Sequence, residues 1–288
     1  MRLGNSRRSE NLEDRRGASG GSRTARRGGL GLGAVALAVI ASYFLGLDPT
    51  QVLRALSGTM TSTEQEVPST RSPAEDAKAV FVSKILAETE DTWSGVFSAA
   101  GERYREPKLV LFTGATDTAC GMGQRAMGPF YCPADQTVYI DLAFYDELTK
   151  RFNAPGEFAQ AYVIAHEIGH HIQHQLGITT KVQKLQARSD EVTANALSVR
   201  LELQADCLAG MWAKRTDAAK QILEPGEIEQ ALNAAAAIGD DRMQKRAQGY
   251  AVPDSFTHGS SQQRMRWFKR GIDNGDFQQC DTFAAEQI

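Results

Sequence analysis

Hydrophobic residues recur at helical spacing through most of the second half of the chain. From Gly156 onward, apolar positions three and four residues apart predict four helices, and residues 74–100 show the same spacing. Two short runs rich in β-branched and aromatic residues predict strands instead, at Lys108–Phe112 ("KLVLF") and Thr137–Leu142 ("TVYIDL"). The four later helices are expected at residues 156–175, 184–214, 226–247 and 261–272. The pattern therefore predicts an α+β fold in which a small sheet precedes a helical half.

A segment of twenty uncharged residues lies near the N-terminus, from Gly28 to Leu47. Its length matches a helix that crosses the hydrocarbon core of a bilayer. Residues 1–27 carry eight arginines against three acidic residues, which places the N-terminus in the cytoplasm and the rest outside. A cleavable signal peptide is the alternative, but its charged region would be unusually long. A buried helix fits less well, because the polar flanking segments offer no core. The sequence predicts a single-pass membrane protein with a periplasmic or otherwise extracytoplasmic domain.

The chain is thus expected to have four parts. Residues 1–27 form a cytoplasmic arginine-rich tail, residues 28–47 a transmembrane helix, residues 48–73 a flexible linker rich in Ser, Thr, Pro and Glu, and residues 74–288 the folded domain. Beyond the tail there are 24 basic and 32 acidic residues. This acidic balance gives no reason to expect a nucleic-acid partner.

Four cysteines are present, and Cys120 and Cys132 bracket a glycine-rich loop that a disulfide could close. Four cysteines allow three pairings. We expect Cys120–Cys132 with Cys207–Cys280, as suits a domain outside the cytoplasm. Four free thiols would suit a cytosolic domain better. A zinc site made of the four cysteines is disfavoured, because no Cys-x-x-Cys pair exists.

Four of the five histidines lie within nine residues of the segment "AYVIAHEIGHHIQHQLG", Ala161–Gly177. On the predicted helix His166 and His170 share a face, roughly opposite the apolar stripe, and Glu167 lies next to them. This is the His-Glu-x-x-His pattern, in which two imidazoles chelate one Zn²⁺ and the glutamate reaches a metal-bound water. A solvated polar face is the alternative, but the segment predicts a metal site.

The two remaining histidines of this helix are not expected to bind the metal. A metzincin would place its third ligand six residues after His170, where Leu176 stands, so that class is excluded. His174 shares the face of the ligands, but three ligands along one straight helix cannot close a tetrahedron around zinc. His171 and His174 are therefore expected to be surface groups or neighbours of the ligands.

The third ligand is expected from the next helix, in "RLELQADCLAG". Glu202 and Asp206 are four residues apart and share a face. A His₂Glu set leaves the fourth position of zinc for water, and Glu202 suits this role. Asp206 suits the role of accepting the free N–H of a ligand imidazole. An ordinary solvated acidic pair is the alternative.

These two motifs resemble the gluzincin arrangement of zinc metallopeptidases. More closely, the chain resembles the neutral zinc metallopeptidase family of bacteria, whose members have an arginine-rich N-terminus and one membrane span. The matching segments cover nearly the whole chain: "SENLEDRRG", "ETEDTWSGVF", "EPKLVLF", "GPFYCPADQTVYIDL", "VIAHEIGHHIQ", "LELQADCLAG" and "DSFTHGSSQQRMRWF". The resemblance implies a zincin-like, membrane-anchored endopeptidase with one zinc per chain, held by His166, His170 and Glu202. Glu167 would be the general base, and the substrate a peptide or protein.

The fifth histidine, His258, lies in a predicted loop just before the helix that Ser260 caps. A lone loop histidine is often a simple surface group. Gluzincins, however, commonly present a late histidine to the oxyanion, and the site needs a donor beside zinc. We therefore hypothesise that His258 donates to the tetrahedral intermediate and that Arg264 orients the loop or the substrate.

Two further expectations concern the substrate and a competing function. Residues 137–142 are expected to be the exposed sheet edge on which a peptide adds as a strand, with an ordinary interior strand as the alternative. A membrane-anchored binding or chaperone-like module with a purely structural zinc is the competing function. A closed structural site would have no use for Glu167.

Overall fold

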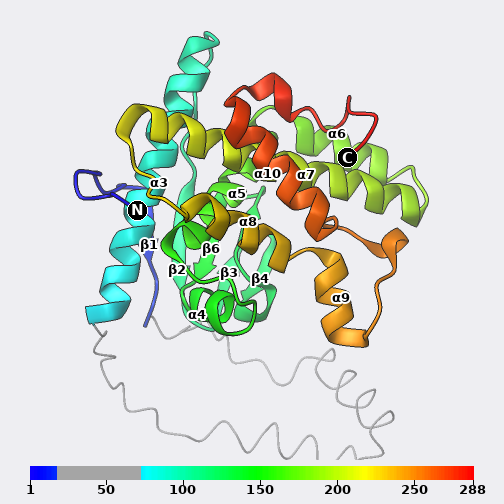
Figure 1. Cartoon of the computed structure of the whole chain (residues 1–288), viewed down its shortest axis with the longest axis horizontal. Helices are drawn as coiled ribbons and strands as arrows, with labels where there is room; N and C mark the ends of the chain where they lie inside the picture. The colour runs from blue at the N-terminus through cyan, green and yellow to red at the C-terminus, as the bar shows by residue number, and fades with distance from the viewer. Residues whose placement is uncertain (18–72) are drawn as a thin grey trace, which may run out of the picture. The chain divides into compact units, whose positions relative to one another are not determined.

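The computed structural model describes residues 1–17 and 73–288, and residues 1–16 belong to one compact unit with residues 73–288 (Figure 1). It confirms the mixed α+β class predicted from the sequence. The strands are β1 (Leu12–Asp14), β2 (Lys108–Phe112), β3 (Ala115–Thr118), β4 (Gly121–Gln124), β5 (Phe130–Cys132) and β6 (Thr137–Asp141). The helices are α3 (Pro73–Ala99), α4 (Ala143–Lys150), α5 (Glu157–Gln175), α6 (Ile178–Gln186), α7 (Glu191–Lys220), α8 (Glu227–Ala237), α9 (Asp240–Gln248) and α10 (Ser261–Asn274).

The main sheet has four strands in the order β1-β2-β6-β5, and β3 and β4 form a separate hairpin. Strands β1, β2 and β6 are parallel, whereas β5 runs antiparallel to β6 with Tyr131 opposite Val138. All five residues of β6 are buried, as expected for a strand covered on both faces. The strand predicted at Thr137–Leu142 thus exists but lies inside the sheet. The expectation that it forms the exposed edge is wrong, because β5 covers it.

Two predicted helices are each divided in the structure. The helix expected at residues 184–214 is α6 and α7, and Asp190 caps the start of α7 by accepting a hydrogen bond from the backbone N–H of Thr193. The helix expected at residues 226–247 is α8 and α9, which separate at Gly239. A Cβ at Gly239 would lie 2.4 Å from the backbone nitrogen of Ser261, so the close approach of α10 requires glycine there.

The helix that carries four histidines packs closely on α7. Gly169, in the middle of α5, lies against Ala205 of α7, and a Cβ at Gly169 would be 3.0 Å from the Ala205 Cα. The two helix axes can therefore approach more closely than larger residues would allow. This contact aligns the middle of α7, which carries Glu202 and Asp206, beside the His-Glu-x-x-His turn of α5.

The N-terminal segment belongs to the folded unit, which corrects the prediction that residues 1–27 form a separate cytoplasmic tail. Leu12 of β1 pairs with Leu109 of β2 in parallel register. Upstream of this strand, Arg7 pairs with Glu90 and Asp91 of α3 at 2.8 Å, and the Ser9 hydroxyl donates to Glu90. These short-range contacts require residues 1–16 and the domain to occupy the same compartment.

The pairing of β1 with β2 also contradicts the predicted single-pass membrane topology. A single span between residues 16 and 73 would separate two segments that are hydrogen-bonded in one sheet. In addition, no helix within residues 1–17 and 73–288 is long and apolar enough to cross a membrane. The predicted span at residues 28–47 and the linker at residues 48–73 lie outside the described residues, apart from Pro73, which begins α3.

The cysteines pair as predicted. Cys120–Cys132 joins the β3–β4 hairpin to the end of β5, and Cys207–Cys280 joins α7 to the short 3₁₀ helix η3 (Phe277–Cys280). Cys132, Cys207 and Cys280 are fully buried. The first disulfide fixes the loop next to the edge strand, and the second fixes the C-terminal segment against the helix that carries Glu202.

Candidate metal centre and active-site cleft

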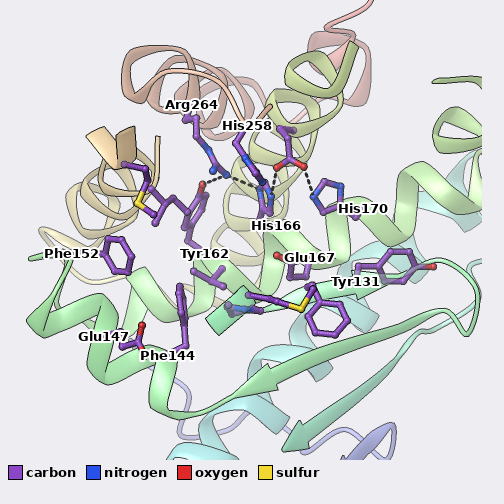
Figure 2. Close-up of a pocket in the computed structure, with 18 of the residues that line it drawn as sticks. Tyr131, Phe144, Glu147, Phe152, Tyr162, His166, Glu167, His170, His258 and Arg264 are labelled. Carbon is purple, nitrogen blue, oxygen red and sulfur yellow. Dashed lines mark hydrogen bonds and ion pairs between the residues drawn. The ribbon is translucent and has the colours of Figure 1, made fainter. Parts of the chain in front are cut away.

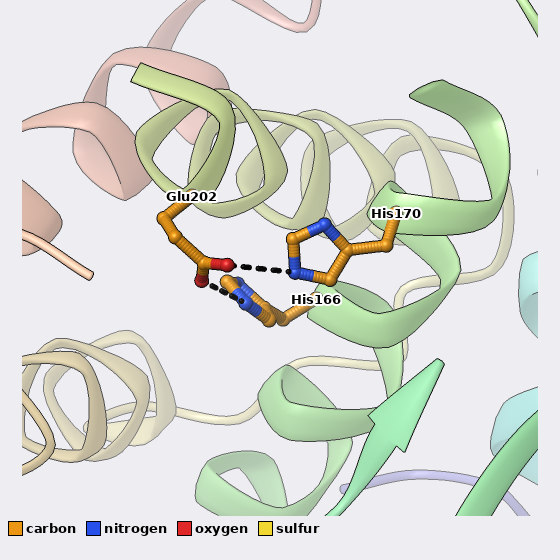
Figure 3. A group of neighbouring side chains, drawn as sticks. All are labelled: His166, His170 and Glu202. Atoms are coloured by element: carbon orange, nitrogen blue, oxygen red, sulfur yellow. Dashed lines mark hydrogen bonds and ion pairs between the residues drawn. The ribbon is translucent and has the colours of Figure 1, made fainter. Parts of the chain in front are cut away.

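The structure brings the three predicted ligands together at the contact between α5 and α7 (Figure 3). His166 and His170 project from successive turns of α5, and Glu202 reaches them from α7. One donor atom from each residue lies within 4.8 Å of the others. The Nε2 atoms of His166 and His170 lie 3.2 and 3.4 Å from the two oxygens of Glu202, so all three side chains converge on one point.

The other ring nitrogen of each histidine is already engaged. The Nδ1 of His166 lies 2.9 Å from Asp206 Oδ1, and the Nδ1 of His170 lies 2.9 Å from Gln173 Oε1. Both acceptors fix the tautomer with the proton on Nδ1, which leaves Nε2 free to bind a metal. Two imidazoles and one carboxylate with oriented outer partners fit Zn²⁺. Gln173 was not predicted; its spacing of three residues after His170 was the available signal.

The ligand side chains are ionisable and in contact with one another, and these contacts shift their pKa values. Burial lowers the pKa of His166, but Asp206 and Glu202 outweigh it and raise the pKa to about 10. Burial raises the pKa of Glu202, yet His170 and His166 outweigh it and hold the pKa well below its usual range. In this arrangement the imidazoles carry protons that a metal ion must displace, so metal binding is coupled to proton release.

Asp206 and Arg264 form a buried ion pair behind the ligands. The Arg264 guanidinium donates to both Asp206 oxygens at 2.9 Å, and the Tyr162 hydroxyl also donates to Asp206. Asp206 is fully buried and Arg264 is 2% exposed. Asp206 thus takes the predicted role beside His166. Arg264 likewise lies directly behind the ligands, where its guanidinium holds Asp206. Its hypothesised role in orienting the loop or the substrate stays a hypothesis.

A cleft with a volume of about 610 Å³ opens in front of the cluster and is lined by His166, Glu167, His170 and Glu202 (Figure 2). Glu167 points into it from α5 between Tyr131 on one side and Phe144 and Phe152 on the other. Burial raises the pKa of Glu167, and the neighbouring histidines partly offset that effect. A carboxylate with a raised pKa beside the metal position is suited to accept a proton.

His258 lines the same cleft, on the loop between α9 and α10, and its hypothesised donation to the oxyanion stays a hypothesis. Asp240, at the start of α9, organises this loop: one of its oxygens accepts the backbone N–H groups of Thr257, His258 and Gly259 at 2.6–3.0 Å. The other oxygen lies 3.3 Å from His258 Nδ1. The hydrogen bond to Asp240 raises the pKa of His258. Asp240 was not predicted, because the sequence separates it from His258 by eighteen residues.

The two extra histidines of α5 lie away from the metal position. His171 is buried, on the side of α5 that faces the sheet. Its Nε2 lies beside the carbonyl oxygen of Arg105, and its Nδ1 lies 3.1 Å from the Tyr131 hydroxyl. Burial lowers the pKa of His171 to about 4, so it remains neutral. His174 is partly buried with its ring 6.1 Å from Tyr131. Neither contributes an atom to the three-residue metal group.

A His-Glu-x-x-His helix with a carboxylate from a later helix is the ligand arrangement found in one class of zinc metallopeptidases. A family model described as "Putative neutral zinc metallopeptidase" matches residues 1–283, and the chain belongs to this family. "Uncharacterized protein YpfJ" of Escherichia coli (strain K12) is 51% identical over 288 residues, which cover 98% of this chain and 99% of that one. "Uncharacterized protein Rv2575" of Mycobacterium tuberculosis (strain ATCC 25618 / H37Rv) is 40% identical over 218 residues, 72% of this chain and 73% of that one. No solved structure matches the chain.

Proposed function

We propose that the protein is a zinc-dependent endopeptidase. The observation that carries this proposal is the convergence of His166, His170 and Glu202 at the wall of a cleft that also contains Glu167. A purely structural zinc site is usually closed by four protein ligands. Here three ligands face an open cleft, and a carboxylate that is not a ligand lies beside them. These features favour catalysis over a binding or chaperone-like module with a structural zinc.

The chain's own residues divide the work of peptide hydrolysis. Zinc, when bound, supplies a Lewis acid and activates water as a nucleophile. Glu167 takes the proton from the attacking water and passes it to the leaving amine. His258 donates a hydrogen bond to the oxyanion that forms on the scissile carbonyl. Asp206 and Gln173 keep the two imidazoles in the tautomer that binds metal.

Strand β5 is the sheet edge next to the cleft, and Phe130 and Tyr131 of this strand line it. An edge strand has a free row of backbone donors and acceptors, to which an extended peptide can add as a further strand. We place the substrate backbone along β5, in the role predicted from the sequence for residues 137–142. The Cys120–Cys132 disulfide holds the end of this edge in place.

Cleavage of an unfolded protein such as casein by zinc-loaded protein tests the proposal. Glu167→Gln is expected to keep one zinc per chain and to lose activity, because it removes only the base. His166→Ala, His170→Ala and Glu202→Ala are expected to lose both zinc and activity. Zinc is measured by elemental analysis of the dialysed protein. Full zinc content in Glu202→Ala would remove Glu202 from the ligand set, and cleavage by Glu167→Gln would refute its role as base.

A further inference from the structure

One end of the cleft is apolar and lies away from the metal ligands. Its walls come from four different parts of the fold: Phe144 of α4, Phe152 after it, Val163 of α5, and Met243 of α9 with Ile238 before it. Figure 2 shows Phe144 and Phe152 together on the side of Glu167 opposite Tyr131. Apolar walls of this kind recognise a large apolar side chain by removing it from water.

The rim of this apolar end is positively charged. The guanidinium carbons of Arg151 and Arg246 lie 5.4 and 5.5 Å from the centre of the Phe152 ring. Arg125, Arg151 and Phe152 line the cleft, and Arg246 reaches it through its contact with Phe152. Glu147 is the acidic partner of Arg125 and Arg151, at 3.8 Å from each. Among the described residues no carboxylate pairs with Arg246, which is exposed. Arg125 and Arg151 thus share one carboxylate in the lining of the cleft, and the Arg246 guanidinium adds a further positive charge over the Phe152 ring.

We propose that the cleft selects polypeptide segments in which a bulky apolar residue near the cleaved bond is accompanied by an acidic residue. The apolar side chain occupies the space between Phe144, Phe152 and Met243, and the acidic residue pairs with Arg246 and Arg151 at the rim. Both guanidiniums lie over the ring of Phe152, so their charges are held next to the apolar wall that the bulky side chain would contact. This inference names the substrate class and rests on the proposed peptidase function.

The test uses peptides that contain one Phe and, within three residues on either side, a Glu, a Gln or a Lys. For the wild-type protein, kcat/KM is expected to be about five-fold higher with Glu than with Gln and lower still with Lys, the size of one exposed charge contact. Replacing Phe by Ser should abolish cleavage at that site. In Arg246→Glu the order of the Glu and Lys peptides should reverse. Arg188→Glu, an exposed arginine of the α6–α7 connection, is the matched control and should keep the wild-type order.

A binding measurement separates failure of this inference from failure of the proposed function. Zinc-loaded Glu167→Gln protein is titrated with the same peptides, labelled with a fluorophore, and anisotropy reports affinity. If the wild-type protein cleaves peptides with no preference for Phe or Glu, the substrate class is wrong although the peptidase function stands. A different result is that no peptide is cleaved, but affinity falls from the Glu to the Gln to the Lys peptide and this order reverses in Arg246→Glu. The cleft then selects this class of peptide, and the peptidase function is wrong. Binding without order overturns the inference.

Discussion

At the scale of single residues, the orientation of His258 decides how the site can stabilise charge. Its Nδ1 lies 3.3 Å from the Asp240 carboxylate and 3.0 Å from the Thr257 hydroxyl. The carboxylate can only accept, so it favours the neutral imidazole with the proton on Nδ1 and Nε2 bare. Donation to an oxyanion through Nε2 therefore requires the imidazolium form. The hydrogen bond to Asp240 raises the pKa of His258 and keeps this form populated to higher pH. Activity should accordingly be lost as pH rises through the raised pKa.

The variant Asp240→Asn tests this link. The pKa of His258 should return toward its ordinary value of about 6.5, so the alkaline limb of the kcat profile should move to lower pH. His258→Ala should keep its zinc and lose roughly 10²-fold in kcat, the effect of removing one oxyanion donor. Two results together would contradict this link: an alkaline limb that does not move in Asp240→Asn, and an unchanged kcat in zinc-loaded His258→Ala. Both residues would then have only a structural role.

The buried pair of Asp206 and Arg264 gives a second prediction at this scale. Arg264→Met removes the two guanidinium hydrogen bonds to Asp206 and leaves its carboxylate buried without a cation. This change should lower the free energy of unfolding by about 3–5 kcal/mol. Asp206→Asn should weaken zinc binding about 10–100-fold, because the His166 ring loses its charged acceptor. The double variant should recover part of the stability lost in Arg264→Met. Urea unfolding measures the stabilities, and purely additive losses would contradict coupling of the two charges.

At the scale of elements, hydrophobic periodicity predicted the helices whose apolar face is encoded within one segment of the sequence. Helix α5 could be predicted because its apolar stripe recurs within one segment, and the spacing of His166 and His170 follows from the helical repeat alone. Glu202 and Asp206 could be placed by the same argument. The division between α8 and α9 could not, because Gly239 is required by contact with Ser261, which is distant in sequence.

Elements that depend on distant partners escaped prediction for the same reason. Strand β1 has only three residues and carries no recognisable apolar alternation; its pairing with β2 is what makes it a strand. Strand β5 is equally short, and its presence turned the predicted edge at residues 137–142 into an interior strand. Asp240 is part of the site only because α9 and the His258 loop meet in space.

The Cys207–Cys280 disulfide gives a prediction for the helical half. It closes a loop of 73 residues, and chain entropy assigns such a cross-link about 4 kcal/mol of stability. The paired change Cys207→Ala with Cys280→Ala should therefore lower the unfolding midpoint in urea. Cys120→Ala with Cys132→Ala, which opens a separation of 12 residues, should cost about 3 kcal/mol. Equal midpoints for all three proteins would show that neither disulfide stabilises the native state.

At the scale of the whole molecule, the N-terminal segment belongs to the same folded unit as the metal site. Strand β1 covers one edge of the main sheet, and Arg7, Ser9 and Asn11 bond the buried Glu90. Breaking this contact would leave the edge of β2 open and the Glu90 carboxylate buried without these donors. The pairing of β1 with β2 and the bonds to Glu90 therefore make residues 1–16 part of the folded unit.

This arrangement predicts that the N-terminus and the cleft occupy one compartment. Single exposed cysteines are introduced at Arg8 and, in a second protein, at Arg188, both outside the disulfides. Intact cells are treated with a membrane-impermeant maleimide, and labelling is compared with that in lysed cells. Because β1 and β2 are hydrogen-bonded in one sheet, both positions should be labelled in intact cells or both protected until lysis. Labelling of one position alone would place a membrane between segments that the structure joins, and would show that β1 does not pair with β2 in the cell.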